Sequence, residues 1–137
     1  MDPPTKEHLM RHQKGFTLVE IMIVVAIIAL LAAIAIPNLL RAKITANDAN
    51  AKATMKTLST ASEAFSAVNG AYPVNITSLT GATPPYLNSN PCGSTSYGFT
   101  VSCTLSASAY TFSAVPTSVG VSGSTTVTMT TGGVLTP

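Results

Sequence analysis

A single apolar run dominates the first third of this chain. It occupies residues 16–36, reads FTLVEIMIVVAIIALLAAIAI, and holds one charged side chain, Glu20. A helix of this length and composition can span the hydrocarbon core of a bilayer. A carboxylate inside such a run is costly without a partner, so Glu20 is a candidate functional residue. The segment is therefore predicted both to enter a membrane and to pair with something.

The charged residues gather in the first half of the chain. The whole sequence has 137 residues, which leaves room for one domain, and no Asp, Glu, Lys or Arg follows Glu63. The second half is instead rich in Ser, Thr, Gly and Asn. This composition suits an exported protein that packs beside its own copies, although a disordered tail is the alternative. No basic cluster indicates specific binding to nucleic acid.

The helical pattern continues beyond the apolar run. Pro37 interrupts it, so we expect a kink or local unwinding there, with a simple bend at the membrane exit as the milder alternative. Apolar side chains then recur on one side at helical spacing. They are Leu40, Ile44, Ala51, Met55, Leu58, Phe65 and Val68. The pattern predicts a hydrophobic segment over 16–37 and an amphipathic segment over 38–69, with the helix itself running from about Phe16 to Val68.

The spacing of two charged residues and a typical helix-ending pair also fit a helix in this region. Asp48 precedes Lys52 by one helical turn, in the order that favours an ion pair. The pair Asn69-Gly70 is typical of a helix end.

The remaining residues, 70–137, follow a different pattern. A loop over 72–90 is rich in proline, and apolar residues then alternate with polar ones over 97–105 and 110–114. Shorter strands are predicted at 127–129 and 134–135. The result is a small antiparallel sheet whose apolar face needs the helix as a cover. The fold class is therefore α+β.

Two cysteines, Cys92 and Cys103, lie in this second half. In the oxidising compartment of an exported chain they are expected to form a disulfide, which would contribute about 3 kcal/mol in the chain-entropy model; free thiols are the alternative. The only histidines, His8 and His12, lie near the start, so no zinc set is predicted. No cofactor, metal or catalytic constellation is expected. Asn75-Ile76-Thr77 fits a glycosylation acceptor, a weak motif.

The residues Gly15-Phe16-Thr17-Leu18-Val19-Glu20, behind a short charged leader, carry a resemblance to a known family. They resemble the amino-terminal signature of type IV pilins and pseudopilins. The resemblance is specific over residues 14–43 and architectural beyond them. It implies that a prepilin peptidase removes residues 1–15 as a leader by cutting after Gly15 and then N-methylates Phe16. It also implies that Glu20 meets the terminal amine of Phe16 in a neighbouring subunit; the alternative is a glutamate at the membrane interface.

The resemblance also implies a function. The protein would be a non-enzymatic subunit of a type IV pilus, held in the inner membrane by a single span and then polymerised into an extracellular filament. Its partners would be its own copies, the prepilin peptidase and an assembly machinery with an ATPase motor. Pro37 stands where many pilin helices are kinked or melted, but Ala29 replaces a glycine that the family often has.

Two other functions remain open at this point. The first is a major pseudopilin of a type II secretion system, although the lack of acidic residues after Glu63 disfavours the calcium site that such proteins often carry. The second is a single-span, membrane-anchored binding protein, which would keep its first fifteen residues.

Overall fold

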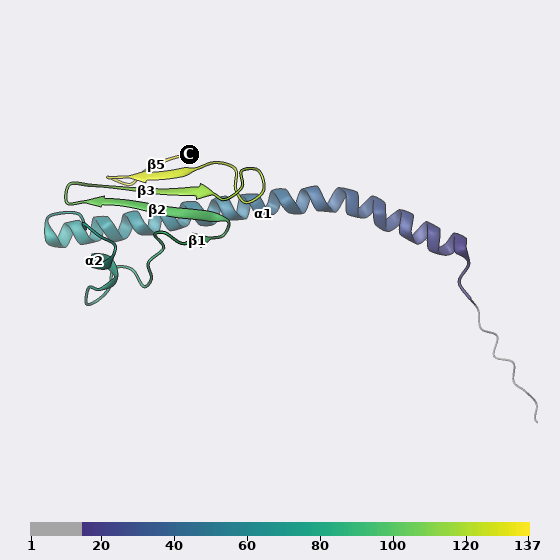
Figure 1. Ribbon diagram of the computed structural model, residues 1–137, viewed down its shortest axis with the longest axis horizontal. Coiled ribbons are helices and arrows are strands. Elements are labelled where there is room, and N and C mark those ends of the chain that lie inside the picture. Colours follow the sequence, from purple (N-terminus) through teal and green to yellow (C-terminus); the bar gives the residue numbers. More distant parts are fainter. Residues whose placement is uncertain (1–14) are drawn as a thin grey trace, which may run out of the picture. The chain divides into compact units, whose positions relative to one another are not determined.

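The computed structural model describes residues 15–137, and within them the chain is α+β, as predicted (Figure 1). It contains a long helix, a four-residue helix and one five-stranded antiparallel sheet. Contacts divide the chain into two units, the first ending at Pro37 and the second running from Asn38 to Pro137. The predicted leader, residues 1–15, lies outside the described residues except for Gly15.

The long helix, α1 (Leu18–Asn69), agrees with the prediction to within two residues at each end. It ends because Gly70 adopts a φ of 72°, a left-handed conformation that glycine accepts without strain. The amide of Gly70 donates a hydrogen bond to the carbonyl of Ser66 at 2.8 Å, which satisfies one of the last carbonyls of the helix. Pro37 is an internal residue of α1, and a kink there stays a prediction.

The part of α1 that belongs to the first unit buries nothing within this chain. Its side chains, including Ile23, Ile27 and Leu31, are exposed. By length and composition, α1 contains a stretch that can cross a membrane, and none of that stretch is buried. Because so much exposed apolar surface is unfavourable in water, this segment needs lipid or protein around it.

The sheet of the second unit is a simple meander. Consecutive strands pair in chain order and all pairs are antiparallel. The strands are β1 (Thr95–Ser96), β2 (Phe99–Ser106), β3 (Ala109–Pro116), β4 (Val127–Thr130) and β5 (Val134–Thr136). The four predicted strands are confirmed, and β1 was not predicted. Tyr97 was predicted to begin a strand, which is wrong: it lies in the turn between β1 and β2 with a φ of 51°.

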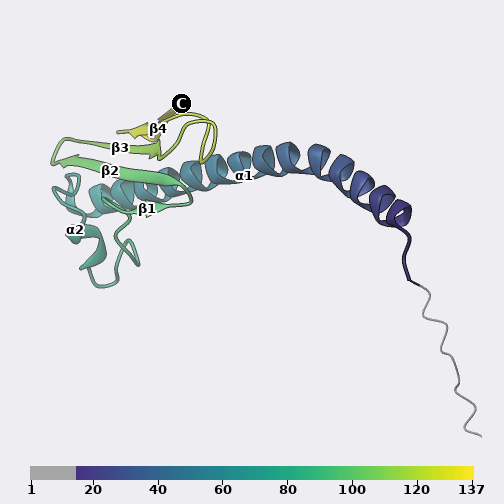
Figure 2. The same ribbon diagram turned by 45° about the vertical axis from the view of Figure 1, so that its right-hand side comes forward.

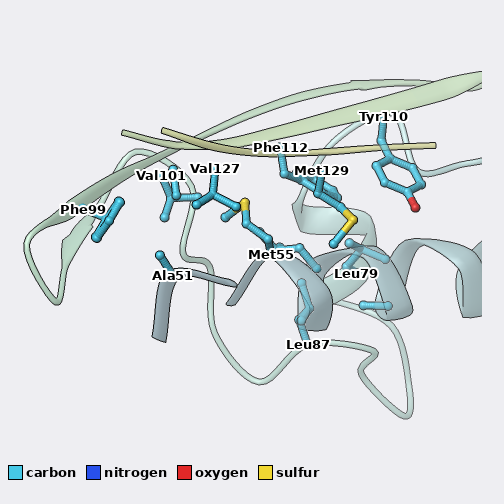
Figure 3. Packing of buried hydrophobic residues seen from close by; sticks show 13 residues of the cluster. Ala51, Met55, Leu79, Leu87, Phe99, Val101, Tyr110, Phe112, Val127 and Met129 are labelled. Carbon is cyan, nitrogen blue, oxygen red and sulfur yellow. The ribbon is translucent and has the colours of Figure 1, made fainter. Parts of the chain in front are cut away.

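The core lies between α1 and one face of this sheet. Figure 3 shows Ala51 and Met55 of α1 facing Val101, Phe112 and Met129 of the strands. The alternating burial of β2 and β3 follows their sequence pattern, since side chains on a strand point to opposite faces. Leu40 and Val68 were expected in this core but are exposed, because the buried residues of α1 run only from Ala51 to Ser62.

The long loop before the sheet differs from its prediction in one respect. It contains a short helix, α2 (Thr77–Thr80), where no regular structure was expected. Asn75 accepts hydrogen bonds from both the amide and the hydroxyl of Ser78, at 2.9 Å each, and this local turn precedes fully buried Leu79. The side chain of Asn75 thus has a structural role, and its glycosylation stays a prediction.

The predicted disulfide between Cys92 and Cys103 is confirmed. It links the loop to β2, with the two Cα atoms 5.7 Å apart. Leu87 of that loop is buried in the core, so the bridge helps to hold the loop over the sheet and helix.

Candidate assembly site

The signature glutamate lies in the first turn of α1 and caps that helix. Oε2 of Glu20 accepts hydrogen bonds from the backbone amide of Thr17 at 2.7 Å and from its hydroxyl at 2.8 Å. In return, the amide of Glu20 donates to Oγ1 of Thr17 at 3.2 Å. This reciprocal pair is a capping box, and it satisfies amides that no earlier helical turn can serve. A negative charge in the first turn is also favourable for the helix dipole.

This capping role was not predicted, although the spacing Thr-x-x-Glu was the available signal. The consequence is an asymmetric carboxylate. Both hydrogen bonds from Thr17 end on Oε2, and none of the hydrogen bonds among residues 15–137 uses Oε1. Because Glu20 and Phe16 are exposed, the second oxygen is open to a donor from outside this chain.

The cleavage and methylation residues lie just before this cap. Gly15 and Phe16 precede the first helical residue, and both are exposed. A side chain added at Gly15 would meet no atom of the described residues within 4 Å.

A second carboxylate, Glu63, has a role that the sequence analysis also missed. Its Oε1 accepts hydrogen bonds from the hydroxyl of Tyr110 at 2.8 Å and from the amide of Gly132 at 3.0 Å. Its Oε2 accepts from the hydroxyl of Tyr72 at 3.0 Å. Glu63 therefore joins α1 to the loop after it, to β3 and to the turn between β4 and β5. The only sequence signal was its position as the last charge in the chain.

These hydrogen bonds decide the charge state of the cluster. Partial burial acts to raise the pKa of Glu63, but hydrogen bonds from Tyr110, Tyr72 and Gly132 outweigh it and lower that pKa below its ordinary value. The hydrogen bond to Glu63 is the main cause that raises the pKa of Tyr72. Burial is the main cause that raises the pKa of Tyr110. At neutral pH the cluster therefore consists of one carboxylate and two neutral phenols.

A third acidic residue, Asp48, holds the loop between β3 and β4. Its Oδ1 accepts from the amide of Ser124 at 2.9 Å, and its Oδ2 accepts from the hydroxyl of Ser124 at 2.6 Å. The ion pair that the spacing of Asp48 and Lys52 favours stays a prediction, since a carboxylate oxygen that accepts one hydrogen bond from Ser124 can still accept another. An exposed lysine gains little from such a pair and keeps its hydration.

The structure does not gather the predicted site residues into one place. Gly15, Phe16 and Glu20 lie together at the start of α1, whereas the disulfide lies in the second unit. Within residues 15–137, no three side chains of the metal-binding types lie close enough to hold an ion. At the start of α1, Gly15 and Phe16 are exposed, and Oε1 of Glu20 accepts no hydrogen bond from residues 15–137. Such a site can be cut, modified or paired.

Comparisons with known proteins agree with this geometry. Residues 10–36 match the family model described as the prokaryotic N-terminal methylation motif. The type IV wide pilus major component PilA4 of Thermus thermophilus is 46% identical over 70 residues, which cover 51% of this chain and 53% of that protein. Competence protein ComGC of Halalkalibacterium halodurans is 40% identical over 68 residues, covering 50% of this chain and 67% of ComGC.

Another similar protein is type II secretion system core protein G of Vibrio cholerae. It is 41% identical over 64 residues, or 47% of this chain and 44% of that protein. The matched region thus spans about half the length of PilA4 and two thirds of ComGC. A methylation motif at the head of a long helix, whose first part is apolar and whose second part packs on a small meander sheet, defines a pilin-like protein. The chain belongs to the type IV pilin and pseudopilin family.

Proposed function

We propose that this protein is a structural subunit of a type IV pilus, polymerised through the apolar part of α1 into an extracellular filament. The observation that carries the proposal is the fully exposed apolar stretch of α1 with the half-used carboxylate of Glu20 in its first turn. The similarity to PilA4, which is named as a major pilus component, supports it. The proposed role is one of assembly rather than catalysis.

Processing comes first in this proposal. The chain waits in the inner membrane as a single-pass protein, and a prepilin peptidase cuts between Gly15 and Phe16. The same enzyme then N-methylates Phe16. The exposure of Gly15 and Phe16 supports this step, because a protease must reach the residues on both sides of the scissile bond. An assembly machinery driven by an ATPase motor then moves the subunit out of the membrane.

Pairing follows processing. Cleavage creates an ammonium group at Phe16, and this group meets the carboxylate of Glu20 in a neighbouring subunit. Each charge alone is unfavourable away from water, whereas the pair is neutral and sets the stagger of adjacent helices. Because the capping box uses only Oε2, Oε1 can receive the ammonium while Thr17 keeps its bonds. One glutamate then both caps its own helix and binds its neighbour.

The two units have different places in the filament. Residues 16–37 form the apolar interior, and residues 38–137 form the uncharged outer surface, apart from the few charges of the amphipathic segment. A bend at Pro37 lets one helix run from the apolar interior of the filament into the unit at its surface. The partners are chiefly other copies of the same chain.

Processing is tested by mass spectrometry of the mature terminus in purified surface filaments. The expected terminus is N-methylated Phe16, and a Gly15→Leu variant should retain the leader and form no filaments. A control Ala49→Leu variant, which enlarges an exposed residue of α1 remote from the motif, should still be cut. A chain that keeps Met1 and is found only in the membrane, not in filaments, would contradict the proposal and would favour a membrane-anchored binding protein.

The match to core protein G favours one alternative, a pseudopilin of a type II secretion system. Such a subunit would share the same leader, cut and helix. Neighbouring genes for secretion components, with loss of secretion but no loss of surface filaments on deletion, would favour it.

A further inference from the structure

A hollow of about 400 Å³ lies between α1, the loop that precedes β1, and β1 itself. Figures 1 and 2 both show that loop and β1 beside α1. All of the residues that line the hollow belong to the second unit, and none of them is charged. We call it the neutral hollow and define it by its polar rim, which includes Thr54, Thr57, Asn88, Ser89, Asn90 and Ser96.

The polar rim has hydrogen-bonding groups that the chain leaves unused. The side chains of Asn88, Ser89 and Ser96 make no hydrogen bond with any residue of 15–137. Asn90 uses only its Oδ1, which accepts from the amide of Cys92 at 2.9 Å, so both of its N–H donors are available. Amide and hydroxyl side chains can each donate and accept. The rim therefore matches a ligand that carries many hydroxyl groups.

The floor of the neutral hollow is apolar. Leu58, Leu87 and Val101 line it, and all three belong to the hydrophobic core of the second unit. An apolar surface with a few polar groups around it is the usual composition of a small-molecule site, and the volume lies within the range of such sites. The floor can pack against the C–H face of a ligand while the rim binds its polar edge.

The loop that carries the rim is held at both ends. Before it, the amide of Leu87 donates to the carbonyl of Leu79 at 3.1 Å. After it, the disulfide joins the loop to β2, and the amide of Gly93 donates to the carbonyl of Val101 at 2.7 Å. Residues 88–90 therefore span a short distance between fixed points, and a site that is already held loses less entropy on binding.

The lack of charge in the hollow indicates what kind of ligand fits it. A charged ligand would lose water there without gaining an opposite charge, which is unfavourable. A second hollow, between α1 and β5, is lined by Lys52 and Lys56 instead. An anion would therefore favour that second hollow, and the neutral hollow suits an uncharged ligand.

We propose that the neutral hollow binds a short, uncharged saccharide. Its hydroxyl groups exchange hydrogen bonds with Asn88, Asn90 and Ser96, and the C–H face of a sugar ring lies on Leu87. This inference goes beyond the assembly role and does not depend on it, because every residue of the hollow belongs to one unit of one chain.

The test measures saccharide binding by the full chain in dodecylphosphocholine, a detergent without a sugar headgroup. Saturation-transfer NMR screens lactose, cellobiose and N,N′-diacetylchitobiose as neutral probes, and glucuronic acid as a charged probe. We expect saturation of at least one neutral disaccharide and none of glucuronic acid. No binding of any neutral probe, or a preference for the charged one, would overturn the proposal.

Two adjacent residues of β1 provide a matched pair of variants. Both are exposed, but Ser96 lines the hollow and Thr95 does not, since neighbouring side chains of a strand point to opposite faces. Ser96→Phe should fill the hollow and abolish the NMR signal of the bound saccharide. Thr95→Phe adds the same ring on the other face and should keep that signal.

A second pair of variants tests the polar rim. Asn88→Leu removes the amide at similar volume and should weaken binding about tenfold. Asn50→Leu changes an exposed asparagine of α1 outside the hollow and should leave binding unchanged. Unaltered binding by Ser96→Phe or by Asn88→Leu would place the saccharide elsewhere and overturn the proposal. Because the test needs no filament, that result would leave the proposed pilus function intact.

Discussion

The two parts of α1 show how one helix can serve two different environments. Before Pro37 its apolar side chains are exposed and make no core, and its one carboxylate leaves an oxygen unused. After Pro37 the buried side chains face a sheet of the same chain, and the carboxylate of Glu63 has hydrogen bonds on both oxygens. The second part is therefore satisfied within the chain, and the first part requires lipid or other copies. The assembly element therefore differs from the folded unit in having apolar side chains and a carboxylate oxygen without partners among the described residues.

The largest expected effect on stability comes from Leu58 of α1, and Leu31 of the same helix is its control. Leu58→Ala removes a side chain with no exposed surface and should lower the free energy of unfolding of the second unit by about 3 kcal/mol. Leu31→Ala, at a leucine that is 61% exposed, should leave that free energy unchanged. Urea titration of the detergent-solubilised full chain, followed by tyrosine circular dichroism, measures both. Equal losses would break the contrast between the two parts of the helix.

A smaller effect is expected at Glu63. Glu63→Ala leaves the hydroxyls of Tyr72 and Tyr110 without their carboxylate and should lower the free energy of unfolding by about 2 kcal/mol. Since the folded-state pKa of Glu63 is lowered, its contribution is present above the unfolded-state pKa of about 4.3 and disappears as the pH falls through the folded-state value.

The control for this cluster is Glu63→Gln, which keeps the side-chain volume and cannot titrate. Its stability should change less with pH than that of the unaltered chain across the acidic range. Identical pH profiles would mean that the cluster is not held by a charged glutamate.

The smallest effect should occur at Asp48. Asp48→Ala removes both hydrogen bonds to Ser124 and should cost about 1 kcal/mol, with faster amide hydrogen exchange confined to residues 117–126. Lys52→Ala is the matched control, one turn away, and should change little because surface charges contribute little. A larger loss from Lys52→Ala than from Asp48→Ala would contradict this order of effects.

The sequence predicted the regular elements well because their signals repeat. The apolar run, the helical spacing from Ala51 to Leu58 and the alternation along β2 and β3 each extend over several residues. The amphipathic pattern gave a wrong prediction at its two ends, since Leu40 and Val68 have the right spacing but are exposed. Periodicity indicates which face of a helix is apolar, not how far its partner extends.

The polar contacts were harder to predict because they join residues far apart in the chain. Asp48 binds Ser124 and Glu63 binds Gly132, and neither partner can be found from local spacing. Of these contacts, only the capping box between Thr17 and Glu20 has a local signature. The roles of Gly15, Phe16 and Pro37 in processing and assembly rest on the motif and stay predictions.

The central claim is that Glu20 assembles the filament through its charge rather than through its cap. Glutamine also serves in a capping box, so Glu20→Gln should keep the start of α1 while removing the partner for the ammonium of Phe16. The most direct measurement is electron microscopy of surface filaments from cells that express this variant, with mass spectrometry of the subunit left in the membrane. The account predicts normal cleavage and N-methylation of Phe16 without filaments. Filaments in normal number would contradict it.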